Sequence, residues 1–93
     1  MESKLNLSDY LNRQHKCYEA NKKYGLSLTN LFVDVKSIQE EVYELEQAVN
    51  DNNNDVLIEE LANILIHCYG LAEKAGKDLD TEVFRKMALW DTK

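Results

Sequence analysis

The residues of this sequence that are best suited to chemistry are acidic side chains at helical spacing in the middle of the chain. Glu41 and Glu44 lie three positions apart, a spacing that places two side chains on the same side of a helix. Glu60 and Asn63 repeat that spacing further along the chain. Residues 40–60 contain eight acidic side chains and no lysine or arginine, so this segment holds no cation of its own.

Carboxylates and an amide that converge in one cleft predict a binding site for a hard divalent cation. Without a cation, neighbouring carboxylates repel one another and raise one another's pKa. Oxygen ligands suit Mg²⁺ and Mn²⁺, and Mg²⁺ commonly completes its coordination shell with water or phosphate oxygens. We therefore predict a Mg²⁺ site, which Mn²⁺ could also occupy, at Glu41, Glu44, Glu60 and Asn63. The alternative interpretation is an ordinary solvated acidic helix face.

Apolar residues recur at steps of three and four along the chain, which predicts an all-α fold of four helices. The first helix is expected from Asp9 to about Tyr24, with Gly25 as its stop. Ser27 or Thr29 is expected to cap the second helix. The apolar seam of that second helix consists of Leu28, Leu31, Val35, Ile38, Val42, Leu45 and Val49.

An Asn-rich break separates the second helix from the third, because Asn and Asp favour turns and caps. The break covers residues 50–54. Asp55 is the expected N-cap of the third helix, which runs to the residue before Gly76. Asp80 or Thr81 is expected to begin the last helix.

The positions of the acidic residues around these helices predict that the two acidic stripes meet. On a helical wheel of about 100° per residue, Glu41 and Glu44 lie on one flank of the apolar seam, with Glu41 about 80° from its centre. Glu60 lies beside the apolar face of the third helix, and Asn63 and His67 continue its stripe. Two antiparallel helices joined by a short loop can bring such flanks together.

Length and composition predict one globular helical domain over residues 1–93. A net charge of −6 argues against nucleic acid as a partner. No apolar run reaches the roughly 20 residues of a membrane span, and the polar start of the sequence predicts no secretory signal. Cys17 and Cys68 are expected to stay reduced, which together with these features predicts a cytoplasmic protein.

The wide apolar surface of the third helix predicts self-association. Its apolar positions cover more than half of the helix circumference, which is more than one partner helix can bury. Four short helices also make a small core. We therefore expect a homo-oligomer, a dimer or a tetramer, that completes the helical bundle.

Two motifs on these helices resemble the signature of a known family. Glu40-Glu41-Val42-Tyr43-Glu44, followed after a loop by Glu60-Leu61-Ala62-Asn63, resembles the EExxE…ExxD signature of the MazG-like, all-α nucleoside triphosphate pyrophosphohydrolases. The resemblance spans about residues 26–93. It implies a MazG-like bundle with Mg²⁺ ligands at Glu41, Glu44, Glu60 and Asn63. It also implies cleavage of a (d)NTP to (d)NMP and pyrophosphate, with Glu41 or Glu44 as the catalytic base.

Two positions depart from the family pattern. Asn63 stands where the family has Asp, so the predicted metal site lacks one negative charge. Trp90 stands where the resemblance implies an Asn that contacts nucleotide. We expect substrate contacts from His67 and Lys74 on the third helix and from Lys86 and Trp90 on the last. Each of these four could instead be an ordinary core or surface residue.

Two other functions are compatible with the sequence. A catalytically weakened or inactive member of the family would bind or sequester nucleotides without releasing pyrophosphate. A helical protein-interaction module would use its acidic face to dock a basic partner. The second alternative predicts no rise in melting temperature when Mg²⁺ is added.

Overall fold

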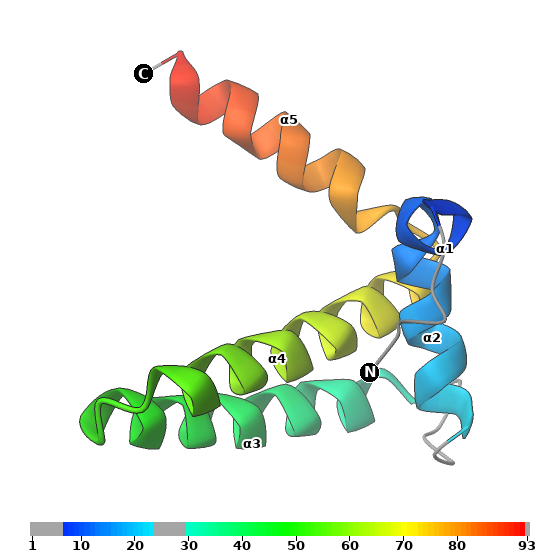
Figure 1. The fold of residues 1–93 in the computed structure, drawn as a ribbon. Helices are drawn as coiled ribbons and strands as arrows, with labels where there is room; N and C mark the ends of the chain where they lie inside the picture. The colour runs from blue at the N-terminus through cyan, green and yellow to red at the C-terminus, as the bar shows by residue number, and fades with distance from the viewer. Residues whose placement is uncertain (1–6, 24–29, 93) are drawn as a thin grey trace.

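The computed structural model describes residues 7–23 and 30–92, which are helical apart from short turns. Five helical segments occur there: α1 (Leu7–Leu11), α2 (Arg13–Lys23), α3 (Leu31–Asn50), α4 (Asn54–Lys74) and α5 (Leu79–Asp91) (Figure 1). These ranges contain no strand. α1 and α2 form one nearly continuous helix, because the N–H of Asn12 donates to the C=O of Ser8 and the N–H of Lys16 donates to the C=O of Asn12, at 3.0 Å each. The prediction of an all-α fold with four helices is therefore confirmed.

α3 and α4 lie side by side as an antiparallel hairpin, joined by the Asn-rich turn (Figure 1). Asn52 adopts a φ of 54°, a left-handed conformation that asparagine tolerates better than most residues. The N–H of Asn53 donates to the C=O of Ala48 at 2.9 Å and closes the turn. The side chain of Asn53 then caps α4 by accepting a hydrogen bond from the N–H of Val56 at 3.2 Å. The predicted cap at Asp55 is wrong, because the turn closes before that residue.

The cap of α3 is a residue that the sequence pattern did not single out. The side-chain oxygen of Asn30 accepts a hydrogen bond from the N–H of Phe32 at 3.0 Å, in the usual manner of an asparagine N-cap. The predicted stop at Gly25 and the predicted caps at Ser27 and Thr29 lie outside the described residues.

α5 begins earlier than predicted. Its N-cap is Asp78, whose carboxylate accepts a hydrogen bond from the N–H of Thr81 at 3.0 Å, so that Leu79 is the first helical residue. The predicted start at Asp80 or Thr81 is wrong, because Asp78 offers the same capping chemistry nearer to the preceding turn. Gly76 follows α4 with a φ of 74°, which confirms it as the helix stop.

The side of α3 that packs on α4 is rotated away from the centre of the predicted seam. Val35, Val42 and Val49 belong to that seam and are 37%, 40% and 54% exposed. The side chains of α3 that are buried or half-buried are those of Val33, Asp34, Ser37, Ile38, Glu41, Leu45 and Ala48. α4 therefore covers one flank of the stripe, which includes Glu41, and leaves the valines of the other flank on the surface.

Few apolar side chains are buried within the described residues. Ala48 and Tyr69 form the buried apolar core, and α2 packs across α4 while α5 projects away from the hairpin (Figure 1). The radius of gyration is 14.8 Å, whereas a compact domain of this length has about 12 Å. The accessible surface is 7426 Å², against about 5,500 Å² for a compact monomer of this mass. Homo-oligomer formation stays a prediction, and this open shape supports it.

No helix in the described part of the chain combines the length and the apolar character that a membrane crossing requires. Cys17 and Cys68 are both free thiols. Each thiol is half-buried, and burial raises the pKa of each above its ordinary value.

Candidate metal centre

Three of the four predicted metal ligands lie together where α3 and α4 face each other. Glu41 comes from the inner side of α3, and Glu60 and Asn63 come from successive turns of α4. The side-chain amide of Asn63 donates a hydrogen bond to Oε2 of Glu41 across the hairpin at 3.3 Å. Both glutamates are half-buried and Asn63 is exposed, so the group opens to solvent on the Asn63 side.

The environment of the Glu60 carboxyl group changes its pKa. Contact with the carboxyl of Glu41, followed by burial and by the charges of Glu41 and Glu44, raises the pKa of Glu60 to about 7, while a hydrogen bond with Asn63 acts in the opposite direction. Oε2 of Glu60 is buried and has no hydrogen-bond partner among the described residues. A positive ion beside these carboxylates would act against this rise in the pKa of Glu60.

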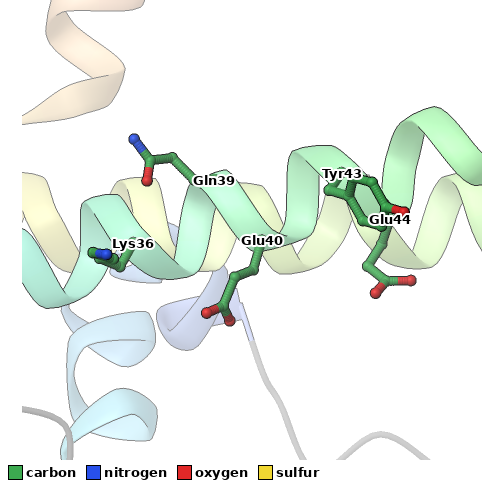
Figure 2. Close-up of a pocket in the computed structure, with 5 residues that line it drawn as sticks. All are labelled: Lys36, Gln39, Glu40, Tyr43 and Glu44. Atoms are coloured by element: carbon green, nitrogen blue, oxygen red, sulfur yellow. The ribbon is translucent and has the colours of Figure 1, made fainter.

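Glu44, the fourth predicted ligand, borders this pair from the outer side of α3. Its side chain is exposed and lines a shallow groove of about 460 Å³ with Lys36, Gln39, Glu40 and Tyr43. Figure 2 shows that all five side chains come from one helix and that the carboxylates of Glu40 and Glu44 project to the same side of it. The charge of Glu44 still reaches Glu60, because it contributes to the raised pKa of that residue.

The donor set fits a hard cation in its chemistry. Within residues 7–23 and 30–92, no three His, Cys, Asp or Glu side chains are already gathered closely enough to hold a metal ion. Glu41 and Glu60 form the inner pair, and Glu44 would have to turn towards them. A buried, unpartnered carboxylate oxygen beside a second carboxylate is nevertheless the arrangement that Mg²⁺ stabilises by charge. The metal assignment of Glu41, Glu44, Glu60 and Asn63 stays a prediction.

Two predicted substrate contacts, His67 and Lys74, lie deeper in the hairpin than the carboxylates. Lys74 is 1% exposed, and its Nζ lies 2.6 Å from Oδ2 of Asp34. The imidazole of His67 is 16% exposed, and its Nδ1 lies 3.7 Å from Oδ1 of the same aspartate. Their predicted contact with substrate stays a prediction.

Asp34 is a buried polar residue that sequence reasoning missed, as is Asn21 of α2. It is fully buried on α3, although most aspartates are found at the surface. Its one visible signal is its place seven residues before Glu41, a spacing that puts both carboxylates on the same side of the helix. That signal could be recognised only by treating an acidic residue as part of the packed face.

The other two predicted contacts, Lys86 and Trp90, lie on α5. With Leu79, Glu82, Val83 and Met87 they line a largely apolar groove of about 450 Å³, and Trp90 is 67% exposed. α5 projects away from the α3–α4 hairpin (Figure 1), so within the chain these two residues do not meet Glu41 and Glu60. Their role in substrate binding also stays a prediction.

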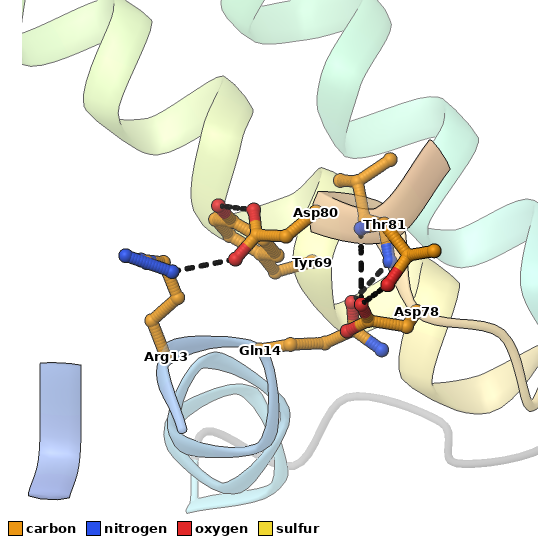
Figure 3. Close-up of polar contacts among 7 residues, drawn as sticks. Arg13, Gln14, Tyr69, Asp78, Asp80 and Thr81 are labelled. Carbon is orange, nitrogen blue, oxygen red and sulfur yellow. Dashed lines mark hydrogen bonds and ion pairs between the residues drawn. The ribbon is translucent and has the colours of Figure 1, made fainter. Parts of the chain in front are cut away.

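A polar clamp fixes the direction in which α5 leaves the hairpin (Figure 3). Asp80 receives a hydrogen bond from the hydroxyl of Tyr69 and pairs with Arg13, both at 2.5 Å. Burial and the contact with Asp80 raise the pKa of Tyr69 to about 12. The side chain of Gln14 donates to the C=O of Lys77 at 2.7 Å and accepts from the N–H of Leu79 at 2.8 Å. The clamp therefore joins α2 and α4 to the start of α5.

Comparison with models of known protein families gave a match. Residues 33–91 match the model of the MazG-like family, a range that includes every predicted site residue from Glu41 to Trp90. The chain therefore belongs to the MazG-like family, and the resemblance noted in the sequence is confirmed. Searches of the curated proteins and of the solved structures gave no match.

Proposed function

We propose that this protein is a Mg²⁺-dependent nucleoside triphosphate pyrophosphohydrolase that converts a (d)NTP into the (d)NMP and pyrophosphate. The observation that carries the proposal is the Glu41–Glu60 pair, which joins the two family motifs across the hairpin. The pKa of Glu60 is raised to about 7 by that contact, and Oε2 of Glu60 is buried without a partner among the described residues. Membership of the MazG-like family supports the proposed reaction class.

The proposed division of labour follows from where each side chain lies. Glu41 and Glu60 would hold Mg²⁺ from inside the hairpin, Asn63 would contribute from the side open to solvent, and Glu44 would complete the set from the rim. When bound, Mg²⁺ neutralises phosphate charge and lowers the pKa of water. Glu44 is the better candidate for the base that accepts the proton of the attacking water, because it is exposed beside the groove, whereas Glu41 is engaged by Asn63 and Glu60.

A second function, nucleotide binding without turnover, is favoured by one specific observation. Asn63 presents its amide group to Glu41 at 3.3 Å and brings no negative charge to the set. A metal site with fewer charged ligands binds its cation less tightly. A chain of this kind would retain affinity for nucleotides while turning them over slowly or not at all.

Pyrophosphate release from a panel of ribonucleoside and deoxyribonucleoside triphosphates tests the proposal. We expect release with Mg²⁺ or Mn²⁺, and we expect Glu60→Gln and Glu44→Gln each to abolish it. Glu59→Gln is the matched control, because Glu59 precedes Glu60 on α4 and is exposed. Nucleotide binding in calorimetry without pyrophosphate release from any nucleotide would establish the second function instead. If neither nucleotides nor Mg²⁺ bind, the chain is a helical interaction module.

A homo-oligomer is the second part of the proposal. The described residues leave large apolar side chains on the surface of α5 and of the hairpin, among them Phe84 at 68% and Ile58 at 63% exposure. A second copy of the chain has the same faces available and could cover them in a symmetric contact. We therefore propose that a dimer or a tetramer is the nucleotide-binding form.

A further inference from the structure

The junction of α2, α3 and α4 holds a buried polar cluster that the proposed reaction does not itself require. Asp34 is 0% exposed, and its Oδ2 pairs at 2.6 Å with Lys74, whose side chain is 1% exposed. Asn21 of α2 is buried beside Gly70 of α4. His67 completes the cluster, with Nδ1 at 3.7 Å from Oδ1 of Asp34.

Three buried atoms of this cluster have no hydrogen-bond partner among the described residues: Oδ1 of Asp34, Nδ2 of Asn21 and Nδ1 of His67. Buried polar atoms in folded proteins are nearly always paired with protein groups or ordered water, so three such atoms together call for a common partner. The distance of 3.7 Å between Asp34 and His67 is too long for a direct hydrogen bond. It is short enough for one water molecule to bond to both atoms.

Because Gly70 has no side chain, the amide of Asn21 can approach α4 and Asp34 closely. A Cβ at Gly70 would lie 2.4 Å from Nδ2 of Asn21 and 3.9 Å from Oδ1 of Asp34. The groups are also complementary, because the amide donates, the carboxylate accepts and an imidazole nitrogen can do either. A single water can accept from Asn21, accept from Nδ1–H of His67 and donate to Asp34, which satisfies all three.

His67 connects this cluster with the candidate metal centre. It lies four residues after Asn63 and seven after Glu60, so the three share one side of α4. A contribution to folding stability is a weak explanation for this cluster, because apolar residues can often replace a buried ion pair without lowering the free energy of unfolding. If groups inside the hairpin hold Nδ1 of His67, Nε2 is the ring nitrogen that remains for a contact with substrate.

We propose that Asp34 is a positioning residue for His67: with Asn21 and a buried water between the three side chains, it holds the proton of the neutral imidazole on Nδ1. In the imidazolium form, Nε2–H is then the donor left for a hydrogen bond to an anionic phosphate. The contact with phosphate rests on the proposed function. The inward Nδ1–H does not, because it follows from the cluster alone.

Long-range ¹H–¹⁵N spectra of the full chain without nucleotide test the positioning directly, at a pH where imidazoles are neutral. We expect His67 to carry its proton on Nδ1, although a free histidine side chain prefers Nε2. In the double variant Asp34→Leu/Lys74→Met, which removes both charges and avoids a lone buried charge, we expect the proton to move to Nε2. His15 is the internal reference and should not change. A wild-type His67 protonated on Nε2 overturns the proposal, as does a double variant with unchanged signals.

A nucleotide assay tests the consequence for binding. The double variant should raise the KM for nucleotide about tenfold, the effect of losing one hydrogen bond to a charged group, while kcat changes less. His67→Gln should raise KM equally, and combining it with the double variant should add nothing. If the spectra show Nδ1–H but no nucleotide is bound or cleaved, the positioning stands and the proposed function fails. If pyrophosphate is released but His67 does not carry its proton on Nδ1, the proposed function stands and the positioning of His67 fails.

The water molecule has a test of its own. A crystal structure should show it within hydrogen-bond distance of Nδ2 of Asn21, Oδ1 of Asp34 and Nδ1 of His67. Direct hydrogen bonds among these three side chains, leaving no space for a water between them, would overturn its part in the proposal.

Discussion

Removing one partner of the buried Asp34–Lys74 ion pair should destabilise the protein far more than removing both. The two side chains are 0% and 1% exposed, and their charged atoms lie 2.6 Å apart. In Lys74→Met the carboxylate of Asp34 loses its nearest counter-charge while remaining buried. In Asp34→Leu/Lys74→Met, apolar groups of similar volume replace both charges, so no buried charge is left behind.

The size of the effect follows from the burial of the pair. Leaving one ion of a buried pair without its partner typically destabilises a protein by about 3–5 kcal/mol. Unfolding a chain of 93 residues has an entropy of about 0.2 kcal/mol/K, so this loss lowers the melting temperature by about 15–25 °C. The double variant should stay within about 1 kcal/mol of the wild type, or exceed it, because its apolar replacements need no counter-charge.

Urea unfolding followed by circular dichroism measures this difference. All variants are compared at one protein concentration, because the stability of an oligomer depends on concentration. Lys77→Met is the control, since Lys77 has an exposed side chain three residues further along. If Lys74→Met loses less than about 1 kcal/mol, the reasoning from burial is refuted. A double variant as unstable as Lys74→Met would refute the statement that the lone charge causes the loss.

Three further predictions concern the acidic pair, Asn63 and the apolar surface. Without metal, the free energy of unfolding should decrease as the pH rises from about 5 to about 7, because the folded chain, with the pKa of Glu60 raised to about 7 from 4.5, binds that proton more tightly than the unfolded chain. Thermal melts should show this decrease flattened by Mg²⁺ or by Glu60→Gln. Asn63→Asp should lower the Mg²⁺ concentration for half-maximal pyrophosphate release, because it adds a negative charge to the site. Met87→Lys, at a 49% exposed position of α5, should shift the protein from oligomer to monomer in light scattering.

Each of these predictions has a contrary result. If Glu60→Gln keeps the wild-type pH dependence of the free energy of unfolding, Glu60 does not cause that dependence. Glu59→Gln is the control variant, which should leave the dependence unchanged. An unchanged or raised Mg²⁺ requirement in Asn63→Asp would show that residue 63 does not contact the metal. A wild-type protein that is monomeric at micromolar concentration would contradict the oligomer, and Arg85→Lys is the matched surface control for Met87→Lys.

The number of helices and their approximate extents could be predicted from the sequence, because apolar periodicity and glycine stops act locally. Gly76 ends α4 as expected. The caps were harder to predict: Asn53 and Asp78 start their helices, whereas Asp55 and Asp80 carry the same capping chemistry two residues later. Which of several suitable residues becomes a cap depends on where the preceding turn closes, and this is decided by how neighbouring helices pack.

In the candidate site, too, some features could be predicted from local spacing and others depend on how the helices pack. Spacing alone indicated that Glu60 and Asn63 would face a partner helix, and Asn63 does contact Glu41. The burial of Asp34 and Lys74 could not be predicted in this way, because a charged residue becomes buried only when a partner from another helix neutralises it. The direction of α5 also depends on distant residues, Arg13 and Gln14, which hold its first turn.

The sequence by itself determined the helical class and the two acidic motifs, because both depend on residue type and on spacing within a single helix. Only the tertiary structure decided which side of α3 faces α4, and with it which glutamates meet across the hairpin. Glu41 and Glu60 lie in that interface, while Glu44 stays at its rim. The physical reason is that α4 covers only part of the apolar stripe of α3, so the rotation of one helix against the other selects the residues that meet.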